Sequence, residues 1–125
     1  MKAVLALLAL FGLAACSDMC ANTEHQTVRS PDGDNAAIVF DRDCGATTGF
    51  NTQVSVVVVD QKAADKGNVF IADGGARTAS WGGPWAKASW VGHNQLLVRY
   101  DDTARIFTQN ESVGDSQISF EPVAR

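Results

Sequence analysis

The stretch TVRSPDGDNAAIVF, residues 27–40, decides the fold. At its centre is a turn in which each residue has a physical reason. Pro31 presets φ, Asp32 caps the neighbouring backbone, and Gly33 accepts a positive φ. A short segment containing valine precedes the turn, and an apolar run, residues 36–40, follows it. Two such segments joined by a turn predict a β-hairpin.

The segments that follow also have the pattern of strands. Residues 53–59 begin with valines alternating with polar residues and end as a run of valines, which is typical of a central strand covered on both faces. The only helix-like stretch, residues 61–66, is too short and polar to stand alone. Further strands are predicted at residues 68–72, 88–91, 95–100, 105–108 and 117–120, with a hairpin turn at Gly92-His93-Asn94. This spacing predicts an all-β fold, a small antiparallel β-sandwich or a rolled sheet.

The N-terminus has the pattern of a cleaved secretory signal peptide. Lys2 precedes an unbroken apolar run, residues 3–15, which is too short for a membrane-spanning helix. The run ends in Leu13-Ala14-Ala15-Cys16, which resembles the lipobox of bacterial lipoproteins. That resemblance implies removal of residues 1–15, acylation of Cys16 and near-permanent attachment to a membrane. The alternative is an ordinary signal peptide cleaved near Ala15, which leaves Cys16 as a free thiol.

The chain has three cysteines, Cys16, Cys20 and Cys44. If Cys16 carries the lipid, the other two are left as a pair, and disulfides persist in exported domains. We therefore expect a disulfide between Cys20 and Cys44, which closes a loop of about 25 residues and stabilises the fold by about 3 kcal/mol. A metal site is the competing interpretation, but two cysteines and two distant histidines lack the spacing of zinc ligands. Neither a metal nor another cofactor is predicted.

The expected organisation is a signal peptide at residues 1–15, a lipid-bearing tether at 16–23 and a single β-rich domain at 24–125. The chain carries 10 Lys/Arg and 14 Asp/Glu, so loss of Lys2 with the signal peptide changes the net charge from −4 to −5. This acidic balance argues against nucleic acid as a partner and against electrostatic binding to an anionic bilayer. Only three residues separate Cys16 from Cys20, a reach of about 12 to 14 Å when extended.

The most distinctive motif is RDCGATTGF, residues 42–50. Together with the upstream SPDG turn, it resembles a family of short bacterial proteins of unknown function, often exported, that share this signature. The similarity covers about residues 30–59 and implies no activity. We favour a rigid connection between two core strands, pinned by the disulfide. The alternative is a small polar pocket formed by Arg42, Asp43, Thr47 and Thr48.

A second candidate site is the long loop at residues 74–85, which ends in WGGPW. Long loops without regular structure are often functional. Trp81 and Trp85, with Trp90 on the next strand, would offer a sugar ring or a peptide a large apolar face. The alternative, which we favour, is that Trp81 or Trp85 plugs one end of a small sandwich.

No catalytic motif is recognisable, so no catalytic residue is predicted. The leading hypothesis is a non-enzymatic envelope lipoprotein, a binding or assembly module that contacts the membrane through Cys16 and another envelope component through its sheet or its tryptophan loop. Binding of a small ligand or a glycan is the runner-up, and an enzyme comes third. By analogy with bacterial sorting, Ser17 after the lipidated cysteine favours the outer membrane, facing the periplasm, although Asp18 weakens this assignment. His25 and His93 are interpreted as ordinary surface histidines.

Overall fold

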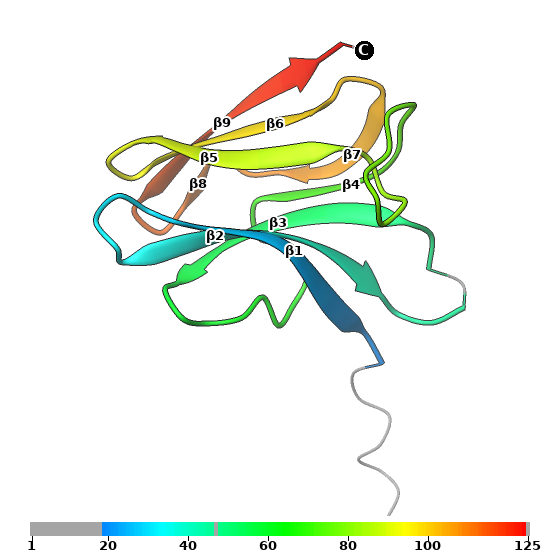
Figure 1. Cartoon of the computed structure of the whole chain (residues 1–125), viewed down its shortest axis with the longest axis horizontal. Helices are drawn as coiled ribbons and strands as arrows, with labels where there is room; N and C mark the ends of the chain where they lie inside the picture. The colour runs from blue at the N-terminus through cyan, green and yellow to red at the C-terminus, as the bar shows by residue number, and fades with distance from the viewer. Residues whose placement is uncertain (1–18, 47, 125) are drawn as a thin grey trace, which may run out of the picture.

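A computed structural model describes residues 19–46 and 48–124. Within these ranges nine strands form two sheets that pack face to face as a β-sandwich (Figure 1). No helix of this part of the chain could cross a membrane. The signal peptide, Cys16 and Thr47 lie outside the described residues. The strands are β1 (Ala21–Arg29), β2 (Asn35–Asp43), β3 (Asn51–Val58), β4 (Phe70–Gly74), β5 (Ala86–Gly92), β6 (Gln95–Asp101), β7 (Ala104–Gln109), β8 (Ser112–Val113) and β9 (Ser116–Val123).

The predicted β-sandwich and its first hairpin are confirmed. The order in one sheet is β1-β2-β3-β4-β7, and the order in the other is β5-β6-β9-β8. In the turn between β1 and β2, Asp32 Oδ1 accepts hydrogen bonds from the Ser30 hydroxyl at 2.6 Å and the Asp34 amide at 3.0 Å, and Gly33 has a φ of 80°. β1 begins at Ala21, so residues 21–23, which were expected in the tether, belong to the sheet.

The central strand β3 is covered on both faces, as its sequence predicts. Residues 52–56 are all buried, whereas Val58, in the run of valines, is 63% exposed. The inner face packs against the second sheet, and the outer face lies under the segment between β3 and β4. Buried Gln53 and Ser55 accept hydrogen bonds from the backbone amides of Gly67 and Asn68, at 2.7 and 3.1 Å. The helix-like stretch is therefore part of a covering loop, held by polar side chains of the strand beneath it.

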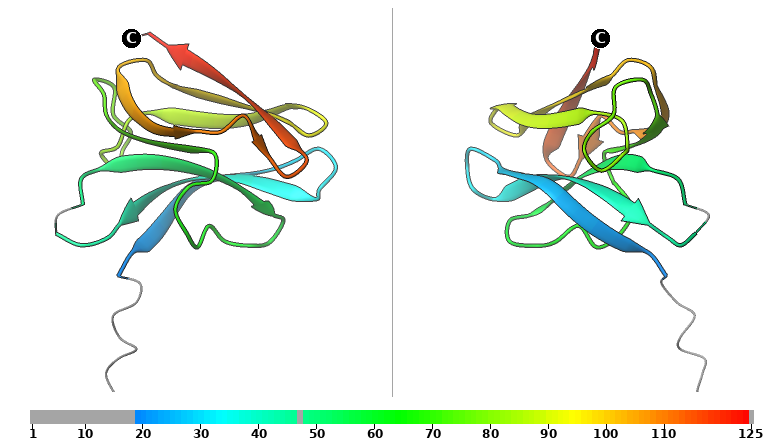
Figure 2. Two further views of the ribbon diagram at one scale, coloured as in Figure 1. Left: turned by 180° about the vertical axis from the view of Figure 1, so that it is seen from behind. Right: turned by 45° about the vertical axis from the view of Figure 1, so that its right-hand side comes forward.

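One strand pair departs from the all-antiparallel expectation. β6 and β9 are parallel, with Leu96 opposite Ile118. After β6 the chain reverses and β7 joins the first sheet, so β7 does not pair with β6. The edge of β6 that β7 leaves open is the one that β9 occupies. It reverses again between β8 and β9. Two reversals return β9 to the direction of β6, and Figure 2 shows the resulting two layers from two further sides.

Apolar side chains from both sheets fill the space between them. Phe70 packs against Tyr100 and Phe120, with ring centroids 5.3 and 6.1 Å apart. Burial of such surface stabilises the fold by about 25 cal/mol per Å². The other buried members include Val39, Val54 and Ala72 from the first sheet and Ala88, Leu96, Val98 and Ile118 from the second.

Candidate functional site

The two motifs singled out in the sequence meet at one end of the sandwich. We call residues 44–50, between β2 and β3, the signature loop and residues 75–85, between β4 and β5, the tryptophan loop; both lie at the right in Figure 1. A Cβ atom on Gly82, whose φ is +93°, would lie 2.8 Å from the Phe50 ring. A Cβ atom on Gly83 would lie 2.2 Å from the Asn51 carbonyl oxygen. The paired glycines of WGGPW thus allow the tryptophan loop to approach the start of β3 closely.

Hydrogen bonds to β3 hold Trp81 in place. Its indole Nε1 donates to the Thr52 hydroxyl at 3.0 Å and to the Asn51 carbonyl at 3.2 Å. The Thr52 hydroxyl in turn donates to the Pro84 carbonyl at 2.6 Å. Thr52 is completely buried, so these bonds are shielded from competing water.

The other support of Trp81 comes from a β-bulge in β1. Glu24 pairs with Phe40 and Gln26 pairs with Val39, so His25 is the extra residue. A bulge redirects a side chain, and the His25 ring stacks on Trp81, with centroids 4.0 Å apart and planes 4° apart. His25 Nε2 lies 2.5 Å from Asp41 Oδ1. His25 is exposed, as its interpretation as a surface histidine requires, but its ring also contacts Trp81 and Asp41. Only the pairing register could have revealed these contacts.

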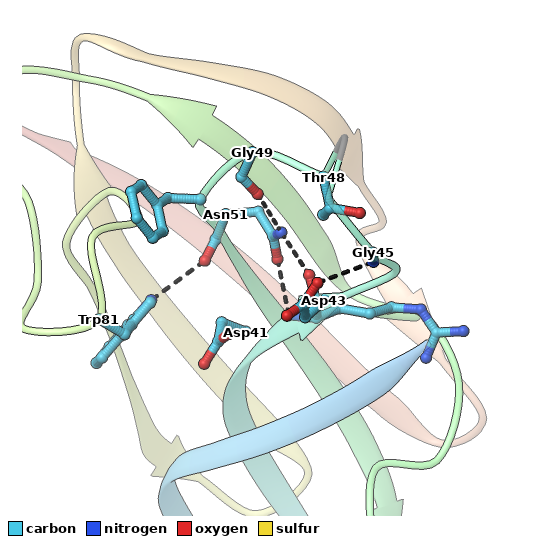
Figure 3. A pocket seen from close by; sticks show the side chains of 9 residues that line it. Asp41, Asp43, Gly45, Thr48, Gly49, Asn51 and Trp81 are labelled. Atoms are coloured by element: carbon cyan, nitrogen blue, oxygen red, sulfur yellow. Dashed lines mark hydrogen bonds between the residues drawn. The ribbon is translucent and has the colours of Figure 1, made fainter. Parts of the chain in front are cut away.

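A polar pocket of about 170 Å³ lies between the signature loop and Trp81; we call it the first pocket. In Figure 3, Trp81 lies on one side and Asp43 on the other, with Asp41 and Asn51 between them. The Asn51 side chain bridges the connection, since its Oδ1 accepts from the Arg42 amide at 3.0 Å and its Nδ2 donates to the Arg42 carbonyl at 2.8 Å. The pocket is therefore built on hydrogen-bonded backbone.

The residues predicted for a polar pocket have separate roles. Arg42 lines the first pocket, and its guanidinium donates to Asn22 Oδ1 at 2.8 Å. Asp43 Oδ1 accepts from the Gly45 amide, and Thr48 Oγ1 accepts from the Cys44 amide, both at 2.9 Å. Asp43 and Thr48 line the first pocket, as the polar-pocket interpretation predicts. They also cap the backbone between β2 and β3, as the rigid-connection interpretation predicts. Thr47 lies outside the described residues.

The predicted disulfide between Cys20 and Cys44 is present. It joins the residue before β1 to the residue after β2, next to the pair formed by Ala21 and Asp43. Because Asp43 and Gly45 line the first pocket, the disulfide ties the start of β1 to the wall of this pocket.

The second pocket has a volume of about 320 Å³ and shares Trp81 with the first. Its lining also includes His25, Trp85 and Lys87. The Arg77 guanidinium lies 4.1 Å from the centre of the Trp85 ring. One face of each indole is thus covered, in Trp81 by His25 and in Trp85 by Arg77, so the two do not form an open double platform.

Trp90 is separate from both pockets. Its Nε1 donates to the Val28 carbonyl of β1 at 2.9 Å, and its ring packs against the core. Gln26 reinforces this edge because its side chain bonds both the amide and the carbonyl of Ala88 in the opposite sheet, at 3.1 and 3.3 Å. Trp90 therefore helps to close the sandwich.

A buried carboxylate anchors the base of the tryptophan loop. Burial would raise the pKa of Asp101, but hydrogen bonds from the backbone of Thr103 and Arg77 and from the Thr103 hydroxyl outweigh it and hold that pKa below its ordinary value of 3.8. The Arg77 amide donates to Asp101 Oδ2 at 2.7 Å, and a Cβ atom on Gly75 would lie equally close to this oxygen. No local sequence pattern predicts this role of Asp101.

No known protein family, no curated protein and no solved structure matches this chain. Among residues 19–46 and 48–124, no group of three or more His, Cys, Asp or Glu side chains could hold a metal ion. The central residue of the site is Trp81, which lines both pockets.

Proposed function

We propose that this protein is a non-enzymatic binding module of the bacterial cell envelope, anchored through lipid on Cys16, whose ligand contacts Trp81. The observation that carries this proposal is that one indole borders two pockets and is held from both sides, by His25 and by Thr52. A large side chain fixed before binding loses little conformational entropy when a ligand arrives. Such preformed, partly aromatic pockets are the usual form of small-molecule sites.

The position of the first pocket supports an envelope ligand. Cys20 is bonded to Cys44 beside this pocket, and Cys16 lies four residues before Cys20. Those four residues reach about 13 Å when extended. In a protein lipidated on Cys16, the pocket would lie at the end of the sandwich from which the anchor leaves. The proposed location is the outer membrane, facing the periplasm.

Glycan binding is the second candidate, and the second pocket favours it. Trp81 and Trp85 both line this pocket. Its volume of about 320 Å³ lies at the lower end of the range of about 300 to 1,000 Å³ for small-molecule sites. Indoles contact the apolar faces of sugar rings, although His25 and Arg77 limit the indole surface that remains.

Tryptophan fluorescence tests the proposal directly. We would titrate the protein, purified in a neutral polyoxyethylene detergent, with sugars, peptidoglycan fragments, peptides and lipid headgroups. A ligand of this site should change the emission of the native protein and of Trp90→Phe, whereas Trp81→Phe should lose the response and bind at least about tenfold more weakly, because the central aromatic contact is altered. Equal binding by Trp81→Phe and the native protein would place the ligand elsewhere.

The same proposal is tested in the native envelope by a photo-cross-linker at Ser80, which lines the second pocket. It should capture an envelope component that the same group at Asp115, in the turn between β8 and β9, does not. Cys16→Ser should remove the protein from the detergent phase. Mutant protein that still partitions quantitatively at the acylated mass would contradict the lipid anchor, and failure of both the titrations and the cross-linking would contradict the binding function.

A further inference from the structure

We infer that the first pocket binds the ammonium group of a lipid headgroup that ends in a primary amine. Asp41 and Asp43 supply the negative charge, and Trp81 and Phe50 supply an aromatic wall. This inference rests on the proposed binding function and specifies the chemistry of its ligand.

The carboxylates of Asp41 and Asp43 are placed to act together. They lie two residues apart in β2, so both side chains project from the same face of the strand. Asp41 Oδ1 is engaged by His25, and Asp43 Oδ1 accepts the Gly45 amide. Within the part of the chain that the structure describes, neither Oδ2 has a protein hydrogen-bond donor. The pocket therefore offers two carboxylate oxygens to a ligand that donates hydrogen bonds.

The neighbouring cation, Arg42, also lines the pocket, but its guanidinium is engaged by other residues. Arg42 lies between them in sequence, so its side chain projects from the opposite face of β2. There the guanidinium is bonded to Asn22 and lies 3.8 Å from Asp65. Because the guanidinium is engaged there, the free oxygens of Asp41 and Asp43 favour a cationic group at this end of the pocket over an anionic one.

The aromatic wall suits the same kind of group. The Phe50 side chain lines the pocket although the residue is 73% exposed, and its ring lies against Gly82. His25 lines only the second pocket, so the first pocket meets Trp81 away from the covering imidazole. An ammonium group is attracted to the negative face of an aromatic ring. The volume of about 170 Å³ is below the range of about 300 to 1,000 Å³ that is usual for sites of whole small molecules. It suits one small charged group of a larger ligand.

The location of the pocket favours a lipid headgroup as the source of the amine. Met19, which is 76% exposed, precedes Cys20, and Phe50 belongs to the loop that Cys44 begins. Two of the most exposed large apolar side chains thus lie at the end of the domain where the anchor would leave. Apolar side chains beside a lipid anchor add to its affinity for the membrane interface. The ammonium group of a headgroup would reach the pocket there. A position beside the membrane would not help the pocket to bind a soluble peptide.

The experiment compares soluble headgroups that carry, mask or lack a primary amine. Protein in polyoxyethylene detergent is titrated with glycerophosphoethanolamine, with its N-acetyl derivative and with glycerophosphoglycerol, and tryptophan emission is followed. Only the free amine should bind, and higher salt should weaken it because screening reduces the attraction. Asp43→Asn keeps the Oδ1 acceptor for Gly45 but removes the charge, so it should weaken binding by about tenfold or more. Asp115→Asn, at the turn between β8 and β9, is the matched control and should bind as the native protein does.

The outcomes separate this inference from the proposed function. Equal binding of the amine and its N-acetyl derivative, or undiminished binding by Asp43→Asn, would overturn the ammonium site while leaving Trp81 as a binding residue. Binding of a lysine-containing peptide but not of glycerophosphoethanolamine would overturn the lipid source. If the amine is inactive but a neutral glycan binds through Trp81, the inference is wrong and the proposed function stands.

Discussion

Replacement of Thr52 by valine tests how firmly the core holds the site. Valine has nearly the shape of threonine, so the change removes a hydroxyl from a completely buried position and leaves the packing intact. Two hydrogen bonds are lost, to the Pro84 carbonyl at 2.6 Å and from Trp81 Nε1 at 3.0 Å. Trp81 keeps its bond to the Asn51 carbonyl, but the buried Pro84 carbonyl loses the Thr52 donor.

An unsatisfied buried acceptor costs about 1 to 3 kcal/mol, so we expect Thr52→Val to lower the free energy of unfolding by about 2 kcal/mol. For a domain of about 100 residues this lowers Tm by roughly 10 °C. Urea unfolding followed by circular dichroism and tryptophan fluorescence measures the change. Thr52→Ser keeps the hydroxyl and loses one methyl group, so it should cost about 1 kcal/mol.

Thr108→Val, in β7, is the control for the substitution itself, and its effect should stay within about 0.5 kcal/mol. Thr52→Val should also weaken any ligand that contacts Trp81, because the indole loses its shorter hydrogen bond. A Thr52→Val protein as stable as the native one, or a Thr52→Ser protein destabilised as much as Thr52→Val, would contradict this role of the Thr52 hydroxyl.

Two further predictions concern the disulfide and the buried carboxylate. Replacing Cys20 and Cys44 together by serine should lower the free energy of unfolding by about 3 kcal/mol, whereas β1 amides should stay protected from hydrogen exchange because the strand pairs with β2 along its length; two free thiols in freshly isolated protein would contradict the bond. The lowered pKa of Asp101 means that the unfolded chain binds its proton more readily, so this group stabilises the fold above about pH 4 and that contribution is lost as pH falls through the folded pKa. As the pH falls, Asp101→Asn should lose less free energy of unfolding than the native protein, and urea unfolding at several pH values measures this. If Asp101→Asn and the control Asp115→Asn lose the same amount, Asp101 does not make this contribution.

Part of the candidate site could be predicted from the sequence. WGGPW and RDCGATTGF were both singled out because their residue types are unusual at those positions. Their direct contact was not predicted, because it depends on the approach of Gly83 to the Asn51 carbonyl, 32 residues away in the chain. Trp90 was predicted to lie beside Trp81 and Trp85, but it bonds the Val28 carbonyl in the opposite sheet instead. A contact between sheets cannot be read from the residues next to Trp90 in the sequence.

The position of His25 illustrates a second limit. Strand alternation alone would put Glu24 and Gln26 on the same face of β1. The bulge instead leaves Glu24 free to accept the Ala63 amide on the outer side, at 3.1 Å, while Gln26 bonds Ala88 of the other sheet. The position of a bulge depends on contacts on both faces of the strand, so no single residue in β1 predicts it.

The sequence by itself determined the strand-rich class, the turn at Pro31–Gly33 and the burial of β3, because apolar alternation and turn chemistry are local properties. The pairing of Cys20 with Cys44 was expected once the resemblance of residues 13–16 to a lipobox set Cys16 aside. Only the tertiary structure decided that β9 runs parallel to β6, that His25 faces Trp81 and that Asp41 and Asp43 share a pocket with that indole. These features depend on which sheet each strand joins and in what register. Register is selected by packing between residues far apart in the chain, and a one-residue shift moves every side chain to the other face.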